Sequence, residues 1–142
     1  MEEPCVSLRA LHGLPLLFVA VVGANLVLAC WAFVANIRKQ QVLPRTFWAV
    51  LLFALVVLVV QVAAGITLTA GGSRPKASLH ILYGLLVGAT AVVQFGLRPG
   101  GFLRAIIVRE PAAFREARLL ALICLTQAAL IVRAYTTGAF GR

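Results

Sequence analysis

Long apolar runs separated by short polar segments dominate this chain. Four runs contain no Asp, Glu, Lys or Arg, and they cover residues 14–35, 46–70, 77–97 and 119–132. A helix of roughly 20 apolar residues crosses the hydrocarbon core of a bilayer. Proline and glycine separate the runs, at Pro44, Gly71-Gly72 and Pro99-Gly100-Gly101, and these residue types begin or end helices. The pattern therefore predicts a single domain, residues 1–142, with membrane-spanning helices at about 8–37, 45–70, 76–98 and 112–137.

The composition supports a membrane protein. Of the 142 residues, 62% are hydrophobic and 12% are charged, whereas a soluble domain carries roughly 25% charged residues. Short connections place consecutive helices side by side and antiparallel. We therefore expect an all-α, integral membrane four-helix up-down bundle.

The basic residues predict the orientation of this bundle. The chain has 13 Lys and Arg against four acidic residues. Eight of the basic residues flank the first and third connections and five lie at the other end. Because Lys and Arg concentrate on the cytoplasmic side, both termini are expected outside. We expect a multi-pass protein of a bacterial inner (plasma) membrane.

The same distribution bears on partners. The spans leave no soluble domain to read a nucleic acid, so the bilayer is the expected partner, with a membrane redox partner or a larger complex as further possibilities. Residues 101–110 combine apolar and charged positions at helical spacing, which predicts a short amphipathic helix in the cytoplasmic interface. Docking to a partner protein is the alternative for this segment.

Several kinds of membrane chemistry are disfavoured by what the runs lack. Cys5, Cys30 and Cys124 form no C-x-x-C pair and no zinc-site spacing. The four runs hold no carboxylate of the kind that small proton-coupled exporters use, and no run looks like an ion-selectivity filter. Two polar residues in the runs, Asn25 and Gln94, are expected to bond across helices.

The two histidines are the main candidates for chemistry. His12 and His80 stand at the starts of the first and third helices, which begin on the same side of an up-down bundle. Neutral imidazoles are the usual axial ligands of haem iron, and two from different helices can hold one haem. Each histidine could instead simply lie in the headgroup region.

Helix geometry indicates which polar groups share a depth. Depth can be counted from the basic residues at the cytoplasmic ends of the helices, at about 1.5 Å per residue. His80, Gln61 and Arg133 then lie roughly 27, 24 and 22 Å from the cytoplasmic boundary. His12 comes out at roughly 39 Å, outside the hydrocarbon core, unless its helix tilts or continues beyond the membrane. Arg133 could pair with a haem propionate or extend to the surface. Tyr83, one turn below His80, could hydrogen-bond a ligand or lie at the wall.

Two segments carry a resemblance to a known family. Residues 61–72, with the pattern Q-x-x-x-G, lead through a short loop to the Leu-His pair in residues 79–84. This arrangement resembles one four-helix half of the haem A synthase family, and the chain is also similar to small four-span bacterial membrane proteins. The resemblance implies haem ligation near the outer face by His80, which matches by motif, and by His12, which matches by position and by the Leu11-His12 pair.

The chain also departs from that family. Haem A synthases resemble two such units fused, with an acidic residue associated with catalysis, whereas this chain has one unit and no acid in its four apolar runs. The resemblance therefore implies electron transfer or haem holding, not an enzyme acting alone. We expect a protein that binds haem b through His80 and His12, with Arg133, Gln61 and Tyr83 beside it. A cofactor-free accessory or scaffold subunit is the alternative.

Overall fold

The computed structural model describes residues 12–40, 42–75, 77–107 and 114–141. Four long helices dominate it, and no strand occurs in these ranges: α2 (Pro15–Ile37), α3 (Arg45–Ala70), α4 (Leu79–Gly96) and α6 (Glu116–Phe140). A short helix, α5 (Phe102–Ile107), lies between α4 and α6. Each long helix is long and apolar enough to cross a membrane. The expected all-α, four-helix membrane bundle is confirmed.

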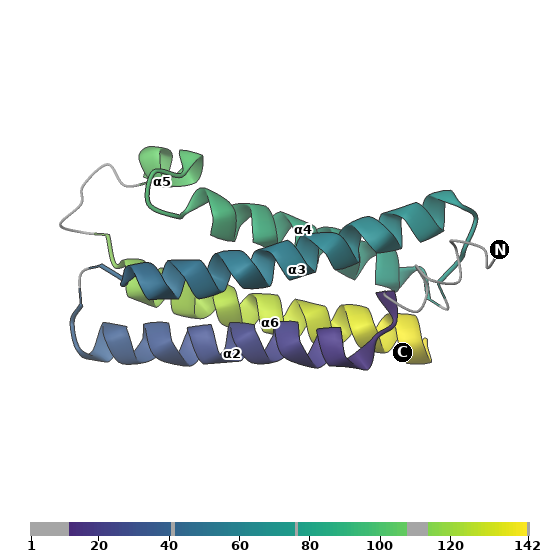
Figure 1. The fold of residues 1–142 in the computed structure, drawn as a ribbon, viewed down its shortest axis with the longest axis horizontal. Coiled ribbons are helices and arrows are strands. Elements are labelled where there is room, and N and C mark those ends of the chain that lie inside the picture. Colours follow the sequence, from purple (N-terminus) through teal and green to yellow (C-terminus); the bar gives the residue numbers. More distant parts are fainter. Residues whose placement is uncertain (1–11, 41, 76, 108–113, 142) are drawn as a thin grey trace.

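The four long helices alternate in direction, so that the start of α2 and the end of α6 lie at the same end of the bundle (Figure 1). Helix α6 packs closely against both α2 and α4. Helix α3 contacts α2 and α4 over shorter stretches and has no close backbone approach to α6. As a result α3 is the most loosely held of the four.

The start of α2 differs from the expected continuous helix from about residue 8. The helical conformation is interrupted at Gly13 and Leu14, and α2 begins at Pro15. Leu14 is extended, with φ −67° and ψ 112°, because a following proline disfavours the helical conformation of the residue before it. His12 therefore lies outside the axis of α2, and the depth of roughly 39 Å expected from a straight helix does not apply to it.

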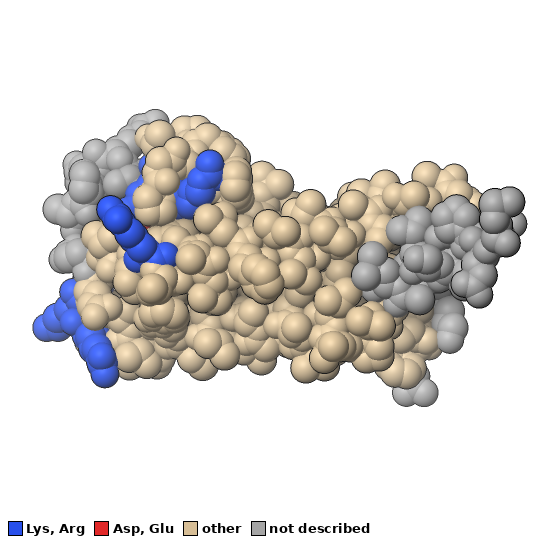
Figure 2. All heavy atoms as spheres, viewed as in Figure 1, with Lys and Arg blue, Asp and Glu red and all other residues tan. Residues whose placement is uncertain are grey.

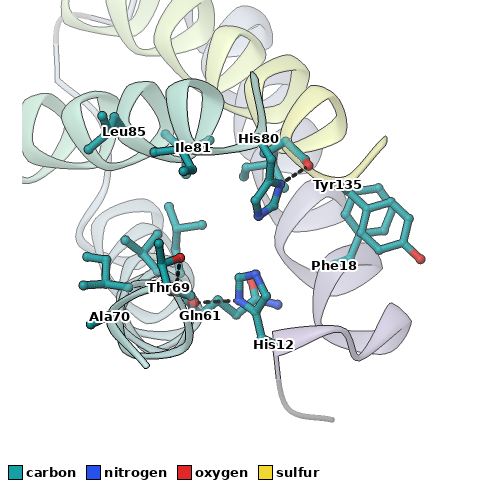
Figure 3. A pocket seen from close by; sticks show the side chains of 17 residues that line it. His12, Phe18, Gln61, Thr69, Ala70, His80, Ile81, Leu85 and Tyr135 are labelled. Carbon is teal, nitrogen blue, oxygen red and sulfur yellow. Dashed lines mark hydrogen bonds between the residues drawn. The ribbon is translucent and has the colours of Figure 1, made fainter. Parts of the chain in front are cut away.

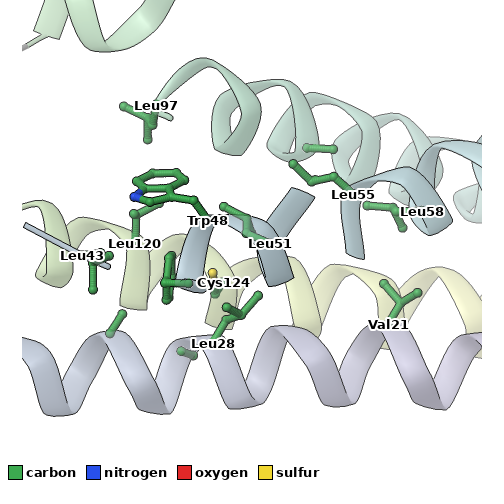
Figure 4. Packing of buried hydrophobic residues seen from close by; sticks show 14 of the residues in the cluster. Val21, Leu28, Leu43, Trp48, Leu51, Leu55, Leu58, Leu97, Leu120 and Cys124 are labelled. Atoms are coloured by element: carbon green, nitrogen blue, oxygen red, sulfur yellow. The ribbon is translucent and has the colours of Figure 1, made fainter. Parts of the chain in front are cut away.

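Tight apolar packing fills the half of the bundle that is nearer to the α2–α3 connection. Leu28, Phe47, Leu51, Leu120 and Cys124 are almost completely buried. Four of them, Leu28 of α2, Leu51 of α3, and Leu120 and Cys124 of α6, point toward one another between these helices (Figure 4). Most other large apolar side chains on the helices are exposed, as a lipid-facing surface requires. This packed half anchors the helices, and the other half is free to enclose a cavity.

Basic side chains gather at the packed end of the bundle, at the α2–α3 connection and around α5 (Figure 2). One of them, Arg104 on α5, forms an ion pair of 2.5 Å with Glu116 at the start of α6. Glu116 is 1% exposed and also accepts a hydrogen bond from the backbone N–H of Leu43. This carboxylate, which no sequence pattern singled out, links α5, α6 and the α2–α3 connection.

Candidate functional site: a pocket with two histidines

A cavity of about 410 Å³ lies at the end of the bundle where α2 begins and α6 ends. Its wall consists of residues from all four long helices and of His12. The volume falls within the range of roughly 300–1,000 Å³ that is typical of small-molecule sites. We call it the paired-histidine pocket, because both histidines of the chain line it (Figure 3).

The two imidazole rings point toward one another across this pocket (Figure 3). Their centroids are 5.9 Å apart and their planes are nearly perpendicular, at 83°. His80 comes from the first turn of α4, whereas His12 reaches the pocket because Gly13 and Leu14 interrupt the helical conformation before α2. Tertiary folding thus brings together two residues that are separated in the chain by two complete membrane crossings, α2 and α3.

Each ring is held by one hydrogen bond to a main-chain carbonyl. His12 Nδ1 lies 3.0 Å from the carbonyl oxygen of Gln61, and His80 Nδ1 lies 2.7 Å from that of Ala134. A carbonyl can only accept, so in each neutral ring Nδ1 carries the proton and donates it. Nε2 is then unprotonated in both rings and keeps a lone pair that can bind a metal.

Two glycines allow the rings to lie this close to the helices. A Cβ atom at Gly65 of α3 would lie 2.8 Å from Cε1 of His12, and one at Gly138 of α6 would lie 2.7 Å from Nδ1 of His80. Gly138 faces the edge of His80 that carries Nδ1 and Cε1, so Nε2 of His80 is directed away from α6. Gly65 faces Cε1 of His12, whose Nδ1 and Nε2 would lie 3.3 and 3.4 Å from the added Cβ, so both nitrogens of that ring lie about equally close to α3.

The other residues expected at the site divide into two groups. Gln61 lines the pocket and orients His12 through its main-chain oxygen. Arg133 and Tyr83 do not line the pocket; instead the Arg133 guanidinium lies 5.6 Å from the centre of the Tyr83 ring. Arg133 is exposed, so its side chain leaves the bundle and does not point into the cavity.

Four residues that shape the pocket are not predicted by the sequence: Phe18, Ala134, Tyr135 and Gly138. Ala134 and Gly138 act through a carbonyl and through the absence of a side chain, and neither feature has a signature in one sequence. Tyr135 stacks on Phe18 with centroids 4.1 Å apart, and both rings line the pocket. The sequence signal for Tyr135 was weak: it is an aromatic residue that follows Arg133 toward the end of α6.

A separate polar cluster lies deeper in the bundle. Gln94 donates to Asn25 Oδ1 at 3.2 Å, so the expected bond across helices is confirmed. Gln94 also contacts the Cys124 sulfur at 3.5 Å, and Gln127 donates to the carbonyl oxygen of Val87. These contacts join α2, α4 and α6, which is the structural role expected of amides in a membrane bundle.

The donor set limits the metals that the pocket could hold. Within the part of the chain that the structure describes, no group of three or more His, Cys, Asp or Glu side chains comes together. A bare zinc ion usually takes three or four protein ligands, so two imidazoles alone do not suit it. They do suit a metal whose other positions are already filled by a macrocycle.

The chain matches no known protein family, no curated protein and no solved structure. The resemblance to haem A synthases therefore rests on the residues that carry it and does not establish membership of that family.

Proposed function

We propose that this chain is a membrane protein that binds haem b between His12 and His80 and serves one-electron transfer or haem-dependent assembly. The observation that supports this most is the pair of facing imidazoles, each with Nδ1 bonded to a carbonyl. Orientation of a ligating histidine by such a hydrogen bond is usual in metal sites.

His12 and His80 are the residues that would hold a haem iron. A bond from a metal to an imidazole nitrogen is about 2.0–2.1 Å long. The two ring centroids are 5.9 Å apart, so the rings are close enough for both to reach one metal ion.

The pocket wall also suits a flat apolar group. Apart from the histidines, the lining is mainly aliphatic and aromatic, with Gly84 leaving additional space on α4. Burying the faces of a porphyrin against such side chains stabilises the complex by removing apolar surface from contact with water. Bound haem would supply one-electron redox chemistry, and the chain would supply its two ligands, their orientation and an apolar surrounding.

Orientation in the membrane follows from the charges. The described basic residues concentrate at the packed end of the bundle (Figure 2). We propose that this end faces the cytoplasm of a bacterial cell, in accordance with the positive-inside rule. The pocket would then lie near the outer face of the membrane, where a redox partner outside the cytoplasm could approach it.

A spectrum of the purified protein tests the proposal. Protein in detergent, supplemented with haem, is expected to give low-spin, six-coordinate b-type bands in a reduced-minus-oxidised spectrum. His80→Ala and His12→Ala should each abolish the six-coordinate form, whereas Tyr83→Phe, outside the pocket, should leave it unchanged. An unchanged spectrum in either histidine variant removes that residue from the site, and absence of bands in the wild type refutes haem binding.

One observation favours a cofactor-free scaffold as the second candidate. Both rings already have carbonyl partners and contact one another edge to face, so they link the segment before α2 to α3, and α4 to α6, without any ligand. On this alternative His80→Ala lowers the thermal stability of protein purified without haem, and added haem does not raise the stability of the wild type. Stabilisation by added haem would count against it.

A further inference from the structure

The paired-histidine pocket is deep on one side and exposed on another. Its inner wall includes Leu58, Val87 and Ile131, each 6% exposed or less. Its outer wall includes Ile66 of α3 and Leu85 of α4, which are 62% and 65% exposed. The pocket is thus a cavity with an open side between α3 and α4.

The residues around this opening are mainly apolar. We call them the mouth residues: Ile66, Thr69, Ala70, Ile81 and Leu85. Ile81 and Leu85 of α4 lie across from Thr69 and Ala70 of α3 (Figure 3). The Thr69 hydroxyl donates to the carbonyl oxygen of Gly65 within its own helix, so its polar group is satisfied. Such a surface faces acyl chains without cost.

Helix packing makes this side of the bundle the easiest to open. Helices α3 and α4 contact one another over a shorter stretch than α6 contacts α2 or α4. Helix α3 has no close backbone approach to α6 behind the pocket. Separating α3 and α4 at the mouth therefore disrupts few contacts, whereas opening the wall formed by α6 would disrupt the tightest packing of the bundle.

We infer that the ligand of the paired-histidine pocket is a bilayer-soluble molecule that enters and leaves sideways, between α3 and α4, from the acyl-chain region. This inference rests on the proposed function, because it assumes that haem is the ligand. The apolar ring of haem partitions into the bilayer while its two propionates stay at the level of the headgroups, and the ring can pass edge first between two helices. The site is then an exchangeable one, filled from the membrane and not from the aqueous phase.

Substitutions at the mouth test the route. Ile66→Trp and Leu85→Trp enlarge the mouth residues, whereas Val56→Trp and Val92→Trp place the same side chain on exposed positions of α3 and α4 outside the pocket. Ligand-free protein in phosphatidylcholine vesicles is mixed with vesicles preloaded with haem, and the rise of the bound-haem absorbance is followed. The mouth variants are expected to take up haem at least fivefold more slowly, and the controls within twofold of the wild type.

A measurement without substitutions keeps the test decisive if tryptophan distorts the pocket. The wild type in vesicles is offered haem coupled through a propionate to a large water-soluble polymer, which keeps the haem out of the acyl-chain region, and uptake of free haem is the control. We expect uptake of free haem and no binding of the polymer-coupled haem. Binding of the polymer-coupled haem at the rate of free haem shows arrival from water and overturns the inference, as do mouth variants that load at the wild-type rate. Absence of a haem spectrum in the wild type refutes the proposed function itself, and the inference with it.

Discussion

Gly138 lies against the edge of the His80 ring that carries Nδ1, so an added methyl group there tests how the ring is held. The alanine Cβ would lie 2.7 Å from Nδ1 and 2.8 Å from Cε1 of His80, about 0.7 Å short of ordinary van der Waals contact, which begins at 3.4 Å. The ring must move away from α6. That movement stretches the 2.7 Å bond from Nδ1 to the carbonyl oxygen of Ala134.

The size of the effect follows from these two contacts. Overpacking of this kind costs about 1–3 kcal/mol, and loss of the hydrogen bond costs about 1 kcal/mol. A penalty of about 2–4 kcal/mol on the ligand-binding geometry corresponds to haem affinity weakened roughly 30-fold to nearly 1,000-fold. Alanine is favoured over glycine inside a helix by about 1 kcal/mol, which offsets part of this penalty in the folded bundle. The free energy of unfolding should therefore fall by less than the free energy of haem binding.

Haem titration of Gly138→Ala is the assay, with Gly88→Ala as the matched control. Gly88 lies on α4 with no atom within 4 Å of its would-be Cβ, and it does not line the pocket. The control should bind haem within about twofold of the wild type. A ligand-free readout is the ¹⁵N resonance of His80 Nδ1, which should shift in Gly138→Ala only. Wild-type affinity and an unshifted resonance in Gly138→Ala would refute the reasoning.

Three further predictions concern the rest of the bundle. Glu116→Gln should lower the free energy of unfolding by about 2–3 kcal/mol, below the range for a fully buried pair because Arg104 is 23% exposed. Arg104→Gln should cost more, since it leaves the buried carboxylate with the Leu43 N–H but without its cation, and thermal denaturation in detergent measures both. If neither substitution lowers stability, the ion pair contributes nothing. Arg133→Gln should leave haem affinity within about twofold and the midpoint potential unchanged, because Arg133 does not line the pocket; a shifted potential in redox titration would instead indicate a propionate partner. Cysteines introduced at Gln40 and Ser73, in a background without native cysteines, should react with a membrane-impermeant reagent from opposite sides of the membrane, with Ser73 labelled from outside; the reverse pattern would contradict the proposed orientation.

The sequence determined the class of this protein and the general course of its chain. Runs of apolar residues ended by proline and glycine are long enough to span a bilayer only as helices, and short connections leave an antiparallel bundle as the arrangement. The same reasoning found His80, at the first turn of α4, and Gln61 on the neighbouring helix. Both were identifiable because polar residues are rare and costly in such a background.

Tertiary structure decided what surrounds those residues. A straight helix places His12 beyond the membrane, and the break before Pro15 brings it to within 5.9 Å of His80, between ring centroids. Counting residues gave Arg133 a suitable depth but not its direction, and its side chain lies by the Tyr83 ring outside the pocket. Depth along a helix follows from the number of residues, whereas the direction of a side chain depends on how the helix is rotated against its neighbours. That rotation results from packing between segments distant in the chain, which no local pattern encodes.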